Sequence, residues 1–246
     1  MTAARPSFDF RLIDTDAGAL PCIVRPPADG PQLLIVPPLF EEMNRTRALL
    51  AGIGRGLTAH GIGSWLPDLP GTGDSALPFA EARLGSWRRA LAELSQQIAA
   101  SDGRKPHLLA VRGGALLANA VDAASRYLLA PATSGERLLR EVMRARLAAD
   151  HERGSPRAMA DLEADLAQAP VELAGYPVSP ALAGDLRTAT LADAGPTRTA
   201  TLGSGTGDVS FDGPPVWRQA EPVAVPALAA AIADDIAQWI GSCANR

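Results

Sequence analysis

The sequence has few of the residues that mark several specialised classes of protein. Its only two cysteines, Cys22 and Cys243, lie near opposite ends without C-x-x-C spacing, which predicts neither a zinc site nor a disulfide framework. It has no long lysine and arginine run, its formal charge is -4, and aromatic residues make up only 4% of it. Nucleic-acid binding needs a basic surface and often rings for stacking. We therefore expect no metal site and no nucleic-acid partner.

Long apolar segments are also missing. No run approaches the roughly 18 consecutive apolar residues that span a bilayer, and the start, MTAARPSFDF, lacks a basic region followed by an apolar core. We expect no membrane span and a cytoplasmic location. Apolar residues nevertheless make up 47% of the 246 positions, which is enough for one large α/β domain with a substantial core.

Predicted strands and helices alternate along most of the chain. Phe8 to Ile13 and Leu20 to Arg25 flank a cluster of turn-forming residues and predict an antiparallel hairpin. Further strands are predicted at Leu33–Val36, Gly63–Pro67, from His107, at Tyr127–Ala130, Thr199–Gly203 and Pro215–Gln219. After a polar loop over Leu39–Asn44, helices are predicted at Thr46–His60, Ser86–Ala100, Glu136–Ala149, Asp150–Ala169 and Val225–Ile240. This alternation predicts an α/β fold with a mostly parallel sheet and helices on both faces.

Glycine-rich segments give no cofactor signature. Gly52, Gly54 and Gly56 lie inside a predicted helix, where each costs about 1 kcal/mol relative to alanine, so we expect close packing of that helix against the sheet. Leu57 stands where G-x-G-x-x-G needs its third glycine. The loop Asp68–Ser75 lacks the lysine of a phosphate-binding loop, although its place after a parallel strand is where such sheets usually form a binding crevice. We expect no cofactor.

The stretch HLLAVRGGALLA, from His107 to Ala118, predicts a buried strand, a tight turn and the start of a helix. Such an elbow presents a catalytic serine when it reads G-x-S-x-G. Here the five places are Ala110, Val111, Arg112, Gly113 and Gly114. A guanidinium stays protonated and cannot attack a carbonyl carbon, so the pattern favours the fold but not the nucleophile.

Several motifs together carry a resemblance to a known family. They are PPLFEEMN from Pro37, the RGGALL elbow from Arg112, PATSG from Pro131, AGY from Ala174 with Ser179-Pro180, and the D-x-P-G-x-G-x-S stretch from Asp68. They resemble the α/β-hydrolase superfamily and, more narrowly, exosortase A system-associated hydrolase 2 proteins. The resemblance implies an α/β-hydrolase core over residues 1–130 and 180–246 with a small helical cap over 131–179. It also implies an ester or acyl hydrolase in an exopolysaccharide and protein-sorting setting.

The residues that match the family's oxyanion donors are present in this sequence, whereas its catalytic base is missing and its acid is ambiguous. Gly113 and Leu39 would supply the two backbone N–H groups, and the acid position could be Asp208, with Asp193 and Asp212 nearby. The histidine position is empty, because none follows His151. Because His107 begins the strand, far from the crevice at the other end, we expect it to have a structural role. We expect His60 and His151 to lie on the surface. The serines considered as substitutes lack an adjacent base or the glycines of an elbow: Ser64, Ser75, Ser134 and Ser204. We assign no catalytic residue.

An arginine at a helix start opposes the helix dipole, at a cost of about 0.3–1 kcal/mol, and therefore calls for an anion. Glu41 or Glu42 of the facing loop could supply it internally. A phosphate, carboxylate or sugar acid could supply it externally, bound jointly by Arg112 and the elbow N–H groups. The binding residues that we predict are Arg112, Gly113, Leu39, Phe40, Glu41 and Glu42.

Four arginines lie on the predicted helix Glu136–Ala149: Arg137, Arg140, Arg144 and Arg146. They form either a solvated face paired with Glu136 and Glu141 or, in part, a set that points at the crevice and binds an anion.

Two function classes remain. One is an active ester or acyl hydrolase that uses unidentified residues, as the family label suggests. The other, favoured by the residues themselves, is a pseudoenzyme on a hydrolase scaffold that binds a small anionic ligand or a protein partner.

Overall fold

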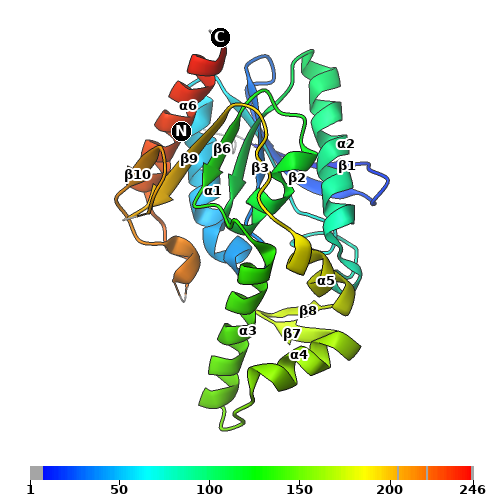
Figure 1. Cartoon of the computed structure of the whole chain (residues 1–246). Coiled ribbons are helices and arrows are strands. Elements are labelled where there is room, and N and C mark those ends of the chain that lie inside the picture. Colours follow the sequence, from blue (N-terminus) through cyan, green and yellow to red (C-terminus); the bar gives the residue numbers. More distant parts are fainter. Residues whose placement is uncertain (1–7, 204, 220, 245–246) are drawn as a thin grey trace, which may run out of the picture.

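The computed structural model describes residues 8–203, 205–219 and 221–244, and its centre is one eight-stranded sheet (Figure 1). The strand order is β1-β2-β4-β3-β5-β6-β9-β10. Their bounds are β1 Asp9–Ile13, β2 Leu20–Arg25, β3 Gln32–Val36, β4 Gly63–Pro67, β5 His107–Val111, β6 Arg126–Leu129, β9 Thr197–Leu202 and β10 Val209–Phe211. The β1–β2 and β2–β4 pairs are antiparallel and every other pair is parallel. The predicted mostly parallel α/β sheet is confirmed.

Helices cover both faces of this sheet, as predicted. Helices α1 (Glu41–Ala59) and α6 (Pro226–Ala244) lie on one face, while α2 (Leu84–Asp102) lies on the other (Figure 1). Successive side chains of β3 point to opposite faces of the sheet. Leu33 and Ile35 belong to the core with α1 and α6, whereas Leu34 and Val36 belong to the core with α2. The apolar run Leu33–Val36 is therefore covered on both faces of the sheet.

The glycines of α1 pack mainly against another helix. A Cβ on Gly52 or Gly56 would lie 2.7 Å from the Cβ of Ala229 or Ala233 on α6, so the expectation of packing against the sheet is wrong for these two. Gly54 does face the sheet, since a Cβ there would lie 2.8 Å from Nε of Arg25 on β2. Small residues on both helices allow α1 and α6 to approach closely.

A helical region projects beyond the sheet between β6 and β9 (Figure 1). It contains α3 (Gly135–Glu152), α4 (Met159–Gln168), the hairpin β7 (Val171–Leu173) and β8 (Tyr176–Val178), and α5 (Pro180–Thr188). The single predicted helix over Asp150–Ala169 is wrong, because α3 continues to Glu152 and α4 begins only at Met159. The domain division at residues 131–179 stays a prediction.

Two elements in this region were not predicted although the sequence contains local patterns for both. The turn of the β7–β8 hairpin has positive φ at Ala174 (49°) and Gly175 (79°), the conformation of tight two-residue hairpin turns. Ser179 accepts a hydrogen bond from the N–H of Leu182 at 3.1 Å and Pro180 opens the helix, which is a helix start of the common serine-capped type.

Three other predictions are corrected by the structure. Helix α1 begins at Glu41, so most of the predicted loop Leu39–Asn44 is helical. The predicted strand Pro215–Gln219 is instead a 3-10 helix, η3 (Val216–Arg218), and the last strand is β10. The element after β5, η2 (Arg112–Ala120), is likewise a 3-10 helix, and a short one, η1, covers Phe79–Glu81. Within the described residues, none of the helices is both long and apolar enough to cross a membrane.

Candidate functional site at the elbow after β5

The chain turns sharply at Arg112, directly after β5. Arg112 has φ 51°, in the left-handed region that is strained for a residue with a side chain. Its carbonyl accepts a hydrogen bond from the N–H of Ala132 at 3.0 Å, which ties the turn to the segment after β6. The predicted elbow is therefore present, with arginine at its strained middle position.

The two glycines after Arg112 are required by close neighbours. A Cβ on Gly114 would lie 2.4 Å from the carbonyl oxygen of Pro37, so the backbone after β3 leaves no space for it. A Cβ on Gly113 would lie 2.7 Å from Cδ2 of Leu138 on α3 and 3.1 Å from Cγ of Leu39. The elbow thus packs directly beneath α3 and beside the loop after β3.

That loop is buried and held by aromatic contacts. Leu39 and Phe40 are both 2% exposed, and Phe40 also has positive φ, 60°. The Phe40 ring lies 6.2 Å from the rings of Phe79 and Tyr176, measured between centroids. The structure thus brings Leu39 beside Gly113, as the resemblance implies, while their role as oxyanion donors stays a prediction.

Arg112 is held by two carboxylates of this chain. Its Nε lies 3.2 Å from both carboxylate oxygens of Glu42 and its Nη2 lies 3.1 Å from Oε1 of Glu42. The same Nη2 lies 3.2 Å from Oε2 of Glu141 on α3. Exposure of the side chains is 13% for Arg112, 19% for Glu42 and 48% for Glu141. The pair with Glu42 is therefore largely shielded from water, and the pair with Glu141 is open to it.

Of the two internal candidates, only Glu42 contacts Arg112. Glu41 instead lies 3.6 Å from Nε of Arg45 and accepts a hydrogen bond from Asn44 at 3.2 Å. Both residues belong to the first turn of α1, where consecutive side chains point about 100° apart. Glu41 is thus excluded as the internal partner of Arg112 by the direction of its side chain.

Burial raises the pKa of Glu42, and the adjacent Arg112 guanidinium acts in the opposite direction. Desolvation is the larger of the two effects. The ion pair therefore only partly offsets the free-energy cost of placing this carboxylate under the elbow.

Trp217 completes the surroundings of Arg112. This side chain is 6% exposed and its ring centroid lies 5.2 Å from the guanidinium carbon of Arg112. Its Nε1 is buried with no hydrogen-bond partner. Trp217 belongs to η3, which follows the last strand, the part of the chain in which a hydrolase of this order carries its histidine. An indole ring thus packs against the arginine of the elbow.

The carboxylates proposed for the acid position are not joined to Arg112. Asp208 is exposed and accepts a hydrogen bond from the N–H of Thr199 at 2.7 Å, which closes the turn between β9 and β10. Asp193 and Asp212 are also exposed. Among the described residues, none of the three hydrogen-bonds to Arg112.

The histidines also lie in other environments. His107 is at the opposite end of β5 from the elbow, its Nδ1 lies 2.8 Å from Oγ of Ser125, and burial lowers its pKa. Nε2 of His60 lies 2.7 Å from Oδ1 of Asp234 on α6, and His151 is exposed near the end of α3. Ser204, one of the serines considered above, lies outside the described residues.

A polar cavity of about 130 Å³ opens beside Arg112. Its lining is Arg112, Pro131, Ala132, Thr133, Ser134, Arg137, Leu138 and Glu141. The arginines of α3 therefore divide between the two interpretations. Arg137 lines the cavity. Arg140 pairs with Glu136 and Arg146 pairs with Asp150, each at 2.8 Å. Over the described part of the chain, no group of three or more histidine, cysteine, aspartate and glutamate side chains is placed to hold a metal ion.

Solved structures with a similar fold include several hydrolase-fold proteins. A protein from Agrobacterium vitis S4, named as a candidate hydrolase, aligns with a TM-score of 0.60 at 14% identity, over 96% of this chain and 100% of its own. Smu.1393c from Streptococcus mutans aligns with a TM-score of 0.53 at 13% identity, over 98% of this chain and 100% of its own. The α/β hydrolase GrgF from Penicillium sp. sh18 aligns with 0.54 at 16%, over 79% of each chain.

These alignments, with the strand order and the helices on both faces, show that the chain has the α/β-hydrolase fold. No family model and no curated protein matches the sequence. At such low identities the likeness concerns the fold alone, and one fold can carry many activities.

Proposed function

We propose that this protein is a non-catalytic, hydrolase-fold binding protein that holds a small anion at Arg112. The observation that carries the proposal is the elbow itself: the position of the nucleophile is taken by an arginine that is shielded from water and paired with Glu42. A guanidinium cannot attack an acyl carbon, but it binds carboxylate and phosphate groups well.

The contacts around Arg112 support a replaceable anion. Glu42 is largely buried and stays as the structural partner, whereas Glu141 is 48% exposed at the edge of the cavity. An incoming carboxylate or phosphate would take the place of Glu141 at Nη2 of Arg112. The Arg112–Glu42 pair would then remain intact beneath the ligand.

Other groups of the same cavity can supply further hydrogen bonds. Arg137 lines the cavity, its side chain is exposed, and its guanidinium has no hydrogen-bond partner among the described residues. The Thr133 and Ser134 hydroxyls belong to the same lining. With about 130 Å³, the cavity suits a compact anion such as phosphate, a short carboxylate or the acid group of a sugar. We propose that residues 131–179 act as a cap, of which α3 covers the anion.

The resemblance to exosortase A system-associated hydrolase 2 proteins suggests the biological setting for this proposal. We propose that the anion is an acidic sugar or phosphate met in exopolysaccharide production or protein sorting. This part rests on the short sequence motifs alone, since the solved structures bear on the fold.

The lack of catalysis is tested with the purified protein. We expect no labelling by a serine-directed fluorophosphonate probe and no turnover of simple aryl esters. In the described part of the chain, the serine that lies beside a histidine is Ser125, 2.8 Å from Nδ1 of His107, and it is 1% exposed and far from the elbow, so a substrate cannot reach it. Labelling that a single serine substitution abolishes, together with ester turnover, would favour the alternative, an active ester or acyl hydrolase.

Anion binding is tested by titration with phosphate, acetate and glucuronate, followed by calorimetry and melting temperature. Arg137→Gln should weaken binding by about tenfold, the loss of one charge-assisted hydrogen bond. Arg144→Gln removes the same charge from an exposed position of α3 that is outside the cavity lining and should leave affinity unchanged. Equal affinity in both variants, or no saturable binding of any of the three anions, would reject the proposed site.

A further inference from the structure

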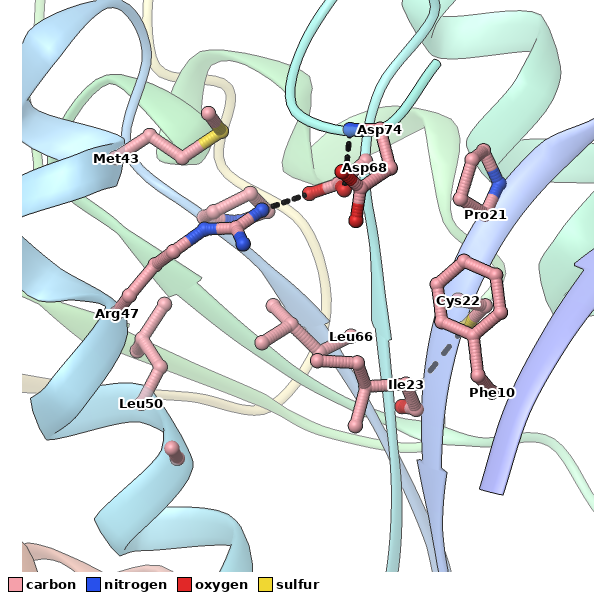
Figure 2. A pocket seen from close by; sticks show the side chains of 12 residues that line it. Phe10, Pro21, Cys22, Ile23, Met43, Arg47, Leu50, Leu66, Asp68 and Asp74 are labelled. Atoms are coloured by element: carbon pink, nitrogen blue, oxygen red, sulfur yellow. Dashed lines mark hydrogen bonds and ion pairs between the residues drawn. The ribbon is translucent and has the colours of Figure 1, made fainter. Parts of the chain in front are cut away.

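A second cavity, of about 120 Å³, lies on the α1 side of the sheet, where β3 and β4 end (Figure 2). Its lining is Phe10, Pro21, Cys22, Ile23, Pro37, Met43, Arg47, Leu50, Ala51, Leu66, Asp68 and Asp74. None of these residues lines the cavity beside Arg112, so the two cavities are separate. The second one adjoins the Asp68–Ser75 loop, the segment expected from sequence to border a crevice.

The walls of this cavity are apolar and uncharged. They come from β2, β4 and the first half of α1, with Ile23, Leu66, Leu50 and Ala51 among them. Cys22 also borders the cavity, but neighbouring residues of a strand point to opposite faces, so its thiol lies on the other side of β2 from the Ile23 side chain. A charged group placed among these apolar side chains would lose its hydration without gaining a partner.

The charges of the site are confined to its mouth and are largely matched. Nη2 of Arg47 lies 2.7 Å from Oδ1 of Asp68, whose Oδ2 accepts a hydrogen bond from the N–H of Asp74 at 2.9 Å (Figure 2). Gly73 makes this possible, because its φ is 54° and a Cβ there would lie 2.3 Å from the Asp68 carboxylate. Arg47 is 45% exposed and has donors to spare beyond its one hydrogen bond to Asp68.

Two adaptable side chains border the cavity. Phe10 comes from the edge strand β1, where it pairs with Ile23 of β2, and it is 55% exposed. Met43, at the start of α1, is a flexible thioether that adjusts its shape to a neighbour. A molecule in the cavity would cover apolar surface that is now in contact with water, which is the driving force for apolar binding.

We infer that this cavity binds a small uncharged apolar ligand, an aromatic ring or a branched alkyl group of about the size of benzene. Size supports this class, since an apolar cavity of about 150 Å³ in another protein binds benzene, and this one has about 120 Å³. Charge supports it too, because the side chains of the wall are apolar and, at the mouth, Arg47 and Asp68 are paired with each other. A carbonyl or ether oxygen on the ligand could accept a hydrogen bond from Arg47.

The test uses the full chain and benzene as the probe. Benzene should bind in a saturable way, seen as a rise in melting temperature and as shifts of methyl resonances of Ile23 and Leu50. Ala51→Leu adds three carbon atoms to the cavity wall and should weaken benzene binding by about tenfold or more. Ala231→Leu makes the same change at an exposed position of α6 and should leave binding unchanged.

Equal benzene affinity in Ala51→Leu and Ala231→Leu, or the absence of saturable benzene binding, would overturn the assignment. Hexanoate and hexylammonium test the charge class, and tighter binding of either ion than of benzene would also overturn it.

Discussion

Helix α1 joins two strand ends through two ion pairs that look alike in sequence but differ in their surroundings. Glu42 contacts Arg112 after β5, and Arg47 contacts Asp68 after β4. In the first pair, Arg112 is 13% and Glu42 19% exposed, whereas in the second Asp68 is 13% but Arg47 is 45% exposed. Both pairs join an arginine to a carboxylate, so their different burial decides how much the loss of one partner changes the free energy of unfolding.

The two cavities beside these pairs differ in polarity, and the more polar cavity lies beside the less exposed pair. The covered Arg112 pair borders a polar cavity with a further arginine, while the exposed Arg47 pair borders an apolar cavity. The two cavities therefore differ in the polarity of their linings, which is the basis for proposing an anion at one and an uncharged apolar group at the other.

Removing Arg112 should give the largest effect. Arg112→Met leaves the Glu42 carboxylate under the elbow without its counter-charge, and we expect a loss of about 3 kcal/mol in the free energy of unfolding, measured by urea denaturation. Arg112→Met combined with Glu42→Gln should recover part of that loss. If the double variant is as unstable as the sum of the single ones, the two residues are not coupled.

The elbow glycines should respond unequally. Gly114→Ala places a Cβ against the carbonyl oxygen of Pro37, and we expect a loss of about 2 kcal/mol, within the range for overpacking. Gly113→Ala meets the end of the Leu138 side chain, which can move, so its loss should be smaller. Equal losses in chemical denaturation would mean that the loop after β3 yields as easily as a side chain.

The pH dependence of stability should show the burial of Glu42. Because the pKa of Glu42 is raised in the folded state, its contribution is fully present below its ordinary pKa and is lost as pH rises through the raised value. Glu42→Gln cannot titrate, so the stability of the parent protein relative to this variant should fall with rising pH over that interval. A difference that grows with pH, in unfolding curves at several pH values, would contradict this.

The exposed pair should give the smallest effect. Arg47→Met should change the free energy of unfolding by less than about 1 kcal/mol, and the change should shrink further in high salt. A loss comparable to that of Arg112→Met would remove the distinction between the two pairs.

Sequence reasoning worked best where one physical pattern dominates a segment. The bounds of β2 and β4 match the prediction, because apolar runs bounded by turn-forming residues have few alternatives. It failed at Glu41–Asn44, a polar first turn that resembles a loop, and at Pro215–Gln219, where two prolines and short length hide a 3-10 turn. Ser179-Pro180 has the local pattern of a helix start, and the predicted elements do not include that helix.

By itself, the sequence determined that the elbow exists, that an arginine occupies it, and that no histidine follows His151. Residue identity and local backbone preference are enough for each of these. Only the tertiary structure decided that Glu42 and not Glu41 is the internal partner, that Glu141 and Trp217 also surround Arg112, and that Asp68 borders an apolar cavity. Those contacts depend on the direction of side chains on α1 and α3 and on how these helices pack against the sheet, which are properties of the whole fold.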